Sequence, residues 1–240
     1  PAKFSAEGLP SEAELALLEP FRDDLPERLF TEPLQRPVSP AMGHNRSALL
    51  KARKLLQEAG WSIRDSILTN ADGEQLTLSF VIQTAGQKRT ILPYIDELRR
   101  LGFVPQIRLV ESAQFVNLMR GFDFDIRFGQ LGVAQPPGVE IVSYWDSKNA
   151  QLSNTRNLTG IESAAADEMV IRLMGARSRE ELIASGRALD RVLMWNFGII
   201  PLRAVEGPSV VYWDKFGRPP FDAEIRTSFP AAWWYDEEKA

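Results

Sequence analysis

The sequence contains no cysteine and only one histidine, His44. Without cysteine the chain has no disulfides, no thiolate metal ligands and no cysteine nucleophile. With a single histidine and no cysteine, the chain also lacks the residues of the usual Ser-His and Cys-His catalytic systems. The lack of cysteine fits an oxidising and a reducing compartment equally well, so it does not indicate where the protein works.

Several other features are missing. No apolar run approaches the roughly 20 residues that a membrane-spanning helix needs, and no Gly-rich phosphate loop of the Walker or dinucleotide type is present. The formal net charge is −4 with acidic and basic residues interspersed, so no broad basic surface is available for nucleic acid. The chain begins with Pro1 and shows neither an initiator Met nor a signal peptide. We therefore expect a part of a longer protein.

Asp123 and Asp125 are the remaining candidates for catalysis. They alternate around Phe124, so both side chains lie on one face or edge of a predicted strand. A pair of carboxylates can act as general acid and base in a hydrolase, whereas two polar residues on the exposed side of a strand are the favoured interpretation. We predict that the chain is not an enzyme and that it needs no cofactor and no metal.

The segment from Leu76 to Phe128 predicts the core of an α/β fold. Apolar residues alternate in its strands and recur at helical spacing between them, with cap residues at the changes. We predict a strand over 76–82, a helix over 87–101, a strand over 106–110, a helix from Ser112 closed by Gly121, and a strand over 124–128. Such β-α-β-α-β units form parallel sheets, whose ligands lie beyond the carboxyl ends of the strands. The loop after Phe128 is therefore the first place to look for function.

The flanking regions differ in composition. Residues 1–45 hold seven of the sixteen prolines, which predicts an extended tail with short helices over 11–18 and 26–30. The region 129–160 is predicted to be irregular, with an aromatic pair at Tyr144 and Trp145. We further predict helices over 47–60, over 161–174 and from a capping box at 178–181 to about Trp195, and strands over 199–202 and 210–213.

Short motifs, in order along nearly the whole chain, carry a resemblance to a known family. They are Asn45-Arg46, LKARKLLQEAGW (50–61), FDFD (122–125), Pro137-Gly138 with Tyr144-Trp145, RNLTGI (156–161), RALDRVL (187–193), YWDKFGRP (212–219) and WWYD (233–236). With these motifs the chain resembles the C-terminal half of a family 5 extracellular solute-binding protein, in the branch associated with microcin C and oligopeptide uptake.

The resemblance implies the second lobe of a type II periplasmic-binding-protein fold. It implies a proline-rich interlobe tail over 1–45, a substrate-binding lobe over 46–205, and a segment over 206–240 that returns to a first lobe. It also implies a periplasmic location, a peptide or peptide-like solute as ligand, and ABC permease subunits in the inner membrane as partners. Nucleic acid and a membrane span of its own are not expected.

The resemblance places the ligand at a small set of residues, each with a structural alternative. The candidates are Gln130, Trp145, Arg156, Asn157 and Arg203. Trp145 either contacts ligand or fills the lobe core, Asn157 either contacts ligand or holds its own loop, and Arg203 is either a ligand anchor or part of a surface ion pair.

Two departures from the family pattern concern the ligand. Peptide binders of the wider family often carry an Asp after the third strand, yet residues 129–135 contain no acid. The Trp-Pro and Trp-His pairs typical of the microcin-type branch are also replaced. A stand-alone domain that binds a protein partner through Trp213, Trp233 and Trp234 remains the alternative to a transport role.

Overall fold

A computed structural model describes residues 4–35, 45–132, 137–202, 211–217 and 232–239. The chain divides into a compact unit over Phe4–Gly198 and a second unit formed from Ile199 onward together with Pro1–Lys3. His44 and Arg203 lie outside the described residues. Within the described part, no helix combines the length and the hydrophobicity needed to cross a membrane.

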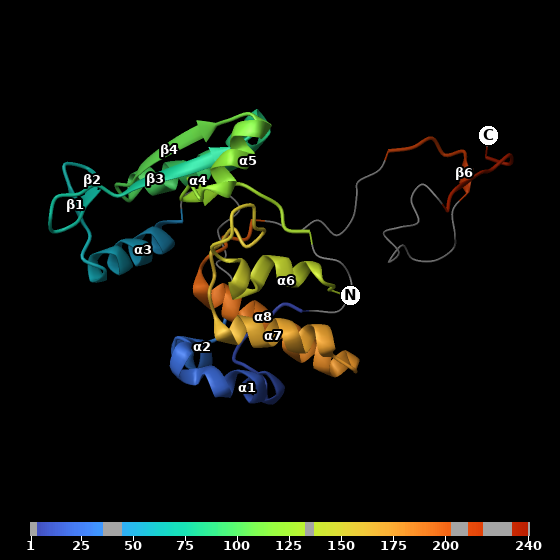
Figure 1. The fold of residues 1–240 in the computed structure, drawn as a ribbon. Helices are drawn as coiled ribbons and strands as arrows, with labels where there is room; N and C mark the ends of the chain where they lie inside the picture. Colours follow the sequence, from blue (N-terminus) through green and yellow to red (C-terminus); the bar gives the residue numbers. More distant parts are fainter. Residues whose placement is uncertain (1–3, 36–44, 133–136, 203–210, 218–231, 240) are drawn as a thin grey trace. The chain divides into compact units, whose positions relative to one another are not determined.

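The larger unit contains a three-stranded parallel sheet with the order β4-β3-β5. Figure 1 shows β3 and β4 side by side. Its elements follow the chain as β3 (Thr77–Ile82), α4 (Ala85–Arg100), β4 (Val104–Leu109), α5 (Ser112–Arg120) and β5 (Ile126–Arg127). β3 pairs in parallel with both neighbours. The predicted β-α-β-α-β unit is therefore confirmed.

Each face of this sheet is covered by one helix. On one face Phe80 and Ile82 of β3 form a cluster with Ile91, Ile95 and Leu98 of α4. On the opposite face Val81 packs with Val110, Leu118 and Met119, the last two from α5. Alternation along β3 explains this division, because successive side chains of a strand point to opposite faces. Both clusters were readable from the spacing of apolar residues.

Some element boundaries differ from the prediction. α4 begins at Ala85 because Thr84 and Gln87 form a reciprocal capping box. α5 begins at Ser112, as predicted, and its N-cap residue Glu111 makes no side-chain capping bond. β5 has only two residues, since the sheet pairing at its position covers only Phe80↔Ile126 and Val81↔Arg127.

Several elements were not predicted. β1 (Ser62–Arg64) and β2 (Ile67–Thr69) form a small antiparallel hairpin, and its two turn residues, Asp65 and Ser66, both adopt positive φ. That conformation suits a two-residue hairpin turn. The region 129–160, predicted to be irregular, contains α6 (Glu140–Trp145) and the short 3-10 helix η2 (Ser147–Asn149).

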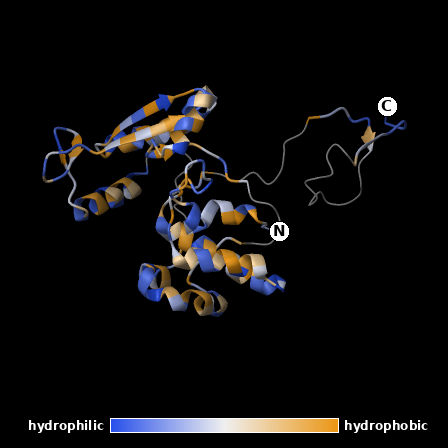
Figure 2. Ribbon diagram, in the orientation of Figure 1, coloured by the Kyte–Doolittle hydropathy of each residue, from blue (hydrophilic) through white to orange (hydrophobic). Residues whose placement is uncertain are grey.

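The rest of the larger unit is helical. α7 (Ala164–Gly175) and α8 (Arg179–Asn196) are joined by three residues and pack against each other, and Figure 2 shows hydrophobic residues along much of α7. Ser178 caps α8 by accepting from the Glu181 amide, but the Glu181 carboxylate accepts from the Arg177 amide instead of completing the predicted box.

The described part of the first 45 residues packs on α8. It contains α1 (Glu12–Leu18), the 3-10 helix η1 (Glu19–Asp24) and α2 (Arg28–Thr31), so the two predicted short helices are confirmed. Leu18 and Leu29 are fully buried. The Phe4 ring lies against Gly186, where an added Cβ would come within 2.5 Å of it. Gly186 therefore allows the Phe4 ring to approach α8 closely.

The helix α3 (Arg46–Glu58) is present as predicted and is capped by Asn45. None of its residues is buried, and Leu50 and Leu55 are exposed.

In the second unit, β6 (Phe216–Gly217) pairs antiparallel with β7 (Trp234–Tyr235). The strand predicted over 199–202 is wrong, because these residues have no regular structure. The strand predicted over 210–213 is wrong for 211–213, and residue 210 lies outside the described part of the chain. Among the described residues, neither run has a partner strand.

Candidate functional site

The chain leaves the sheet at its carboxyl edge just after β5. The Phe128 amide donates to the Val81 carbonyl at 3.2 Å and ends the pairing. The next four residues, 129–132, are all exposed. Gln130 therefore lies in an open segment at the edge where ligands of parallel sheets usually bind. Residues 133–136 lie outside the described part.

Tyr144 and Trp145 are the last two residues of α6. Trp145 is 7% exposed and belongs to the core. Tyr144 is half-buried, and its hydroxyl donates to the Gly132 carbonyl at 3.3 Å. This bond ties the open segment after β5 to α6.

Asn157 is fully buried, and the protein itself occupies its side chain. Its Nδ2 donates to the carbonyls of Asp146 at 3.3 Å and Ile161 at 3.0 Å. Its Oδ1 accepts from the Thr159 hydroxyl at 3.0 Å and from the Ile161 amide at 3.3 Å. Since a side-chain amide has two donors and two acceptor positions, its capacity is used. Asn157 thus holds the loop that presents its neighbour Arg156.

Arg156 is exposed and stacks on an aromatic ring. Its guanidinium carbon lies 5.4 Å from the centre of the Tyr144 ring, within the range of a cation–π contact. Arg127, the last residue of β5, is half-buried. Burial lowers the pKa of Arg127, and Tyr144 partly offsets that effect.

The predicted site is therefore brought together only in part. Trp145, Arg156 and Asn157 lie on or next to one loop and helix, with Gln130 in the segment that Tyr144 contacts. Arg203 cannot be placed. Arg127 was not among the predicted residues; it ends the strand that leads into the segment holding Gln130.

Asp123 and Asp125 do not form a carboxylate pair. Asp123 accepts two hydrogen bonds from Arg108, at 2.9 and 3.2 Å, which lowers the pKa of that carboxyl. Asp125 accepts from the Ser79 amide at 2.7 Å. Each carboxylate has its own structural partner, which is the interpretation favoured from sequence. Among the described residues, no cluster of His, Asp and Glu could hold a metal.

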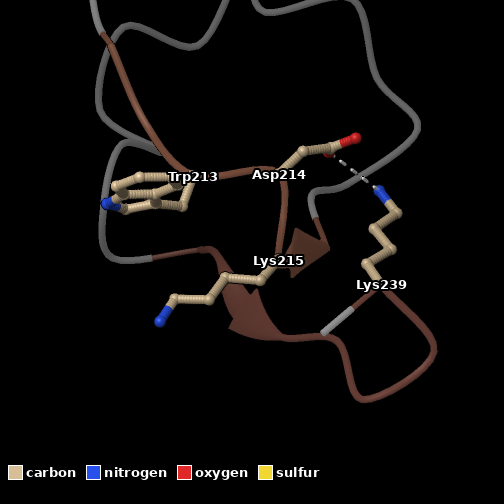
Figure 3. Close-up of a pocket in the computed structure, with 4 residues that line it drawn as sticks. All are labelled: Trp213, Asp214, Lys215 and Lys239. Carbon is tan, nitrogen blue, oxygen red and sulfur yellow. Dashed lines mark ion pairs between the residues drawn. The ribbon is translucent and has the colours of Figure 1, made fainter.

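The second unit has a small surface depression of its own. Trp213, Asp214, Lys215 and Lys239 line it (Figure 3). The Lys239 ammonium lies 3.8 Å from the Asp214 carboxylate, and both groups are largely exposed. An exposed pair of this kind contributes little energy.

The chain is homologous over almost its entire length to proteins called YejA. It is 36% identical to the probable peptide-binding protein YejA of Agrobacterium fabrum over 97% of its own length, and 36% identical to the uncharacterized protein YejA of Escherichia coli over 99%. It is also 31% identical to the peptidoglycan-binding protein YepA of Agrobacterium fabrum over 93%. The chain spans only 36–39% of the length of these relatives. No protein-family profile matches it.

The fold is that of periplasmic oligopeptide-binding proteins, as predicted. The chain superposes on the oligopeptide-binding protein AppA of Bacillus subtilis with a TM-score of 0.54 at 18% identity, covering 78% of this chain and 38% of AppA. A periplasmic oligopeptide-binding protein of Thermotoga maritima, in a structure with bound mannohexaose, gives 0.55 at 15% identity over 64% of this chain and 30% of its own. The two Agrobacterium fabrum relatives and both structural neighbours carry names of binding proteins.

Proposed function

We propose that the chain is the ligand-binding lobe of a solute-binding protein that captures peptides or peptide-like solutes for an ABC importer. The supporting observation is the homology over 97% of the chain to a protein named as peptide-binding, combined with the shared fold. The alternative, a stand-alone domain for protein partners, has no support among the relatives.

The proposal includes the finer points that the resemblance implies. The chain would be the C-terminal half of such a receptor, related to the microcin C branch, with a tail over 1–45, a lobe over 46–205 and a returning segment over 206–240. It would work in the periplasm and deliver its ligand to permease subunits in the inner membrane.

We propose that the predicted site residues have two kinds of role. Gln130 and Arg156 are exposed and contact the solute. Trp145 and Asn157 are buried and hold the surface from which Arg156 projects. Arg203 remains a proposed ligand anchor.

Ligand-induced thermal stabilisation tests the proposal. A ligand that binds only the folded protein raises the unfolding temperature by mass action. Peptide at about ten times its Kd should raise the unfolding temperature of a domain of this size by about 3–6 °C. Pools of di- to nonapeptides should give such a shift. Manno-oligosaccharides are the comparison, because a protein of the same fold binds mannohexaose. Stabilisation by sugars but by no peptide would contradict the proposed function. The absence of any stabilisation by peptide pools at millimolar concentration would contradict it too.

A further inference from the structure

The segment over 129–132 follows β5 at the carboxyl edge of the sheet, and all four of its residues are exposed. The sheet pairing ends just before it, where the Phe128 amide donates to the Val81 carbonyl at 3.2 Å. Among the described residues, the only hydrogen bond to this segment comes from the Tyr144 hydroxyl, which donates to the Gly132 carbonyl at 3.3 Å. Since a glycine stands at each end of the segment, its backbone has wide conformational freedom. The Tyr144 hydrogen bond therefore restricts a part of the chain that little else holds.

Tyr144 belongs to a helix that is anchored in the larger unit. The next residue, Trp145, is buried in the core. The carbonyl of the residue that follows α6 accepts from the Asn157 side chain at 3.3 Å. One residue further on, the Ser147 amide donates to the Asp167 carboxylate of α7 at 2.8 Å. The Tyr144 hydroxyl thus joins a weakly held segment to a well-anchored helix.

Two neighbours restrict the Tyr144 ring. The ring of Trp145 lies at a centre-to-centre distance of 6.1 Å, and the Arg156 guanidinium carbon lies 5.4 Å from the centre of the Tyr144 ring. Arg156 is in turn held by its neighbour Asn157, whose side chain makes four hydrogen bonds to the protein. The helix α6 and the loop over 155–160 therefore set the position from which the hydroxyl reaches Gly132.

We propose that Tyr144 is a positioning residue of the solute site: its hydroxyl holds residues 129–132, and Gln130 with them, in one conformation before the solute binds. This inference rests on the proposed function and adds a residue to it. Peptides are often bound through backbone hydrogen bonds, which require backbone groups in fixed places. A surface that is already ordered loses less conformational entropy when a ligand binds. If only a fraction of the molecules hold the competent conformation, the apparent affinity falls by that fraction.

Nitrogen-15 relaxation of the 240-residue chain without ligand tests the hydroxyl contact. The backbone amides over 130–132 should have order parameters of about 0.8 in the unmodified chain and below about 0.6 in Tyr144→Phe. Phenylalanine keeps the ring and its contact with Arg156, so the variant removes the hydroxyl alone. Tyr94→Phe is the matched control, because Tyr94 belongs to α4 and packs edge-on against a ring of β3 at 6.3 Å. It should leave these order parameters unchanged.

Titration with trialanine and with pentaalanine, followed at the Gln130 amide signal, measures the effect on binding. Tyr144→Phe should weaken peptide binding about two- to tenfold, the factor that one hydrogen bond accounts for. A double variant, Tyr144→Phe with Gly132→Ala, should recover part of this loss. Alanine reduces the backbone freedom of the segment, and an added Cβ at Gly132 would meet nothing within 4 Å. Such a rescue distinguishes a positioning residue from one that contacts the solute, because a stiffer backbone does not restore a lost contact.

The outcomes separate this role of Tyr144 from the wider proposal. Lower order parameters in Tyr144→Phe together with weaker, rescuable peptide binding support the inference. Unchanged order parameters overturn it even where the affinity falls, since Tyr144 would then contact the solute itself. Lower order parameters with unchanged affinity overturn it as well. If neither peptide binds the unmodified chain up to roughly 20 mM, the peptide role is contradicted, whereas lower order parameters in Tyr144→Phe still support Tyr144 as the residue that orders this segment.

Discussion

Asn157 shows how one buried amide can position an exposed cation. Its four hydrogen bonds join the end of α6, the loop over 155–160 and the start of the segment leading to α7. Arg156 precedes it directly and stacks on Tyr144. The geometry around Arg156 therefore depends on a residue that makes no contact with solvent.

Replacement of Asn157 by Ala should destabilise the chain by about 2–4 kcal/mol, because it leaves two carbonyls, an amide and a hydroxyl without their partner in a buried place. Denaturant unfolding measures this loss. Asn117→Ala on the exposed side of α5 is the control and should change stability by less than about 0.5 kcal/mol. Equal losses of unfolding free energy in the two variants would show that the hydrogen bonds of the Asn157 side chain do not stabilise the fold.

For single residues, the sequence identified candidate positions more reliably than it identified the role of each side chain. For Trp145 and Asn157 the sequence left ligand contact and a structural role open, and their burial favours the structural role.

The N-terminal segment and α8 are held together by one buried cation. Arg191 is fully buried and donates to the Gly8 carbonyl at 2.7 Å and the Glu7 carbonyl at 3.3 Å. Its second terminal nitrogen also lies 3.5 Å from the Glu14 carboxylate, which is almost fully buried. Next to it, the Asp190 carboxylate accepts from the Ala6 amide at 2.9 Å. These contacts fix the chain ahead of α1.

Replacement of Arg191 by Gln should cost about 3–5 kcal/mol, because it leaves the Glu14 charge buried and uncompensated. Hydrogen exchange locates the effect. The amides of Ala6 and Leu34, which bond within this segment, should lose protection before those of α7.

Two further variants serve as controls for that experiment. Arg172→Gln removes an exposed ion pair and should cost at most about 1 kcal/mol. A double variant, Glu14→Gln with Arg191→Met, removes both buried charges and should recover much of the loss. Uniform loss of protection across the larger unit would contradict a local role for Arg191.

At the scale of elements, sequence patterns within a helix predicted that helix well, whereas contacts between distant parts of the chain could not be predicted. The helices α3, α4, α5 and α8 follow from apolar spacing and caps close to them in sequence. The contact between Arg191 and Glu14 joins residues 177 positions apart, and no local pattern encodes it. The strand predicted over 199–202 failed for the same reason, since a strand forms only where a partner strand is available.

The whole chain has surfaces that suit a part of a larger binding protein. No residue of α3 is buried in a hydrophobic core, although Leu49, Ala52 and Leu56 lie on one face of the helix. The chain spans 38% of the length of the Agrobacterium fabrum YejA protein. In the proposed two-lobed receptor, peptide is enclosed between lobes. The sequence predicted the α/β core through periodicity, and the resemblance predicted the fold that the solved structures share.

This arrangement predicts weak peptide binding by the 240-residue chain. With one proposed wall of the site present, solvent remains on the other side of the ligand, so fewer apolar contacts form and charge pairs stay screened. Isothermal calorimetry with the best peptide from the thermal screen should give a Kd well above about 1 µM.

The matched comparison is the full-length Agrobacterium fabrum YejA protein and the segment of it that aligns with this chain. The full-length relative should bind tightly and its segment weakly. Submicromolar binding by the 240-residue chain would show that this lobe forms a complete site, and the proposal of a peptide enclosed between two lobes would then be wrong.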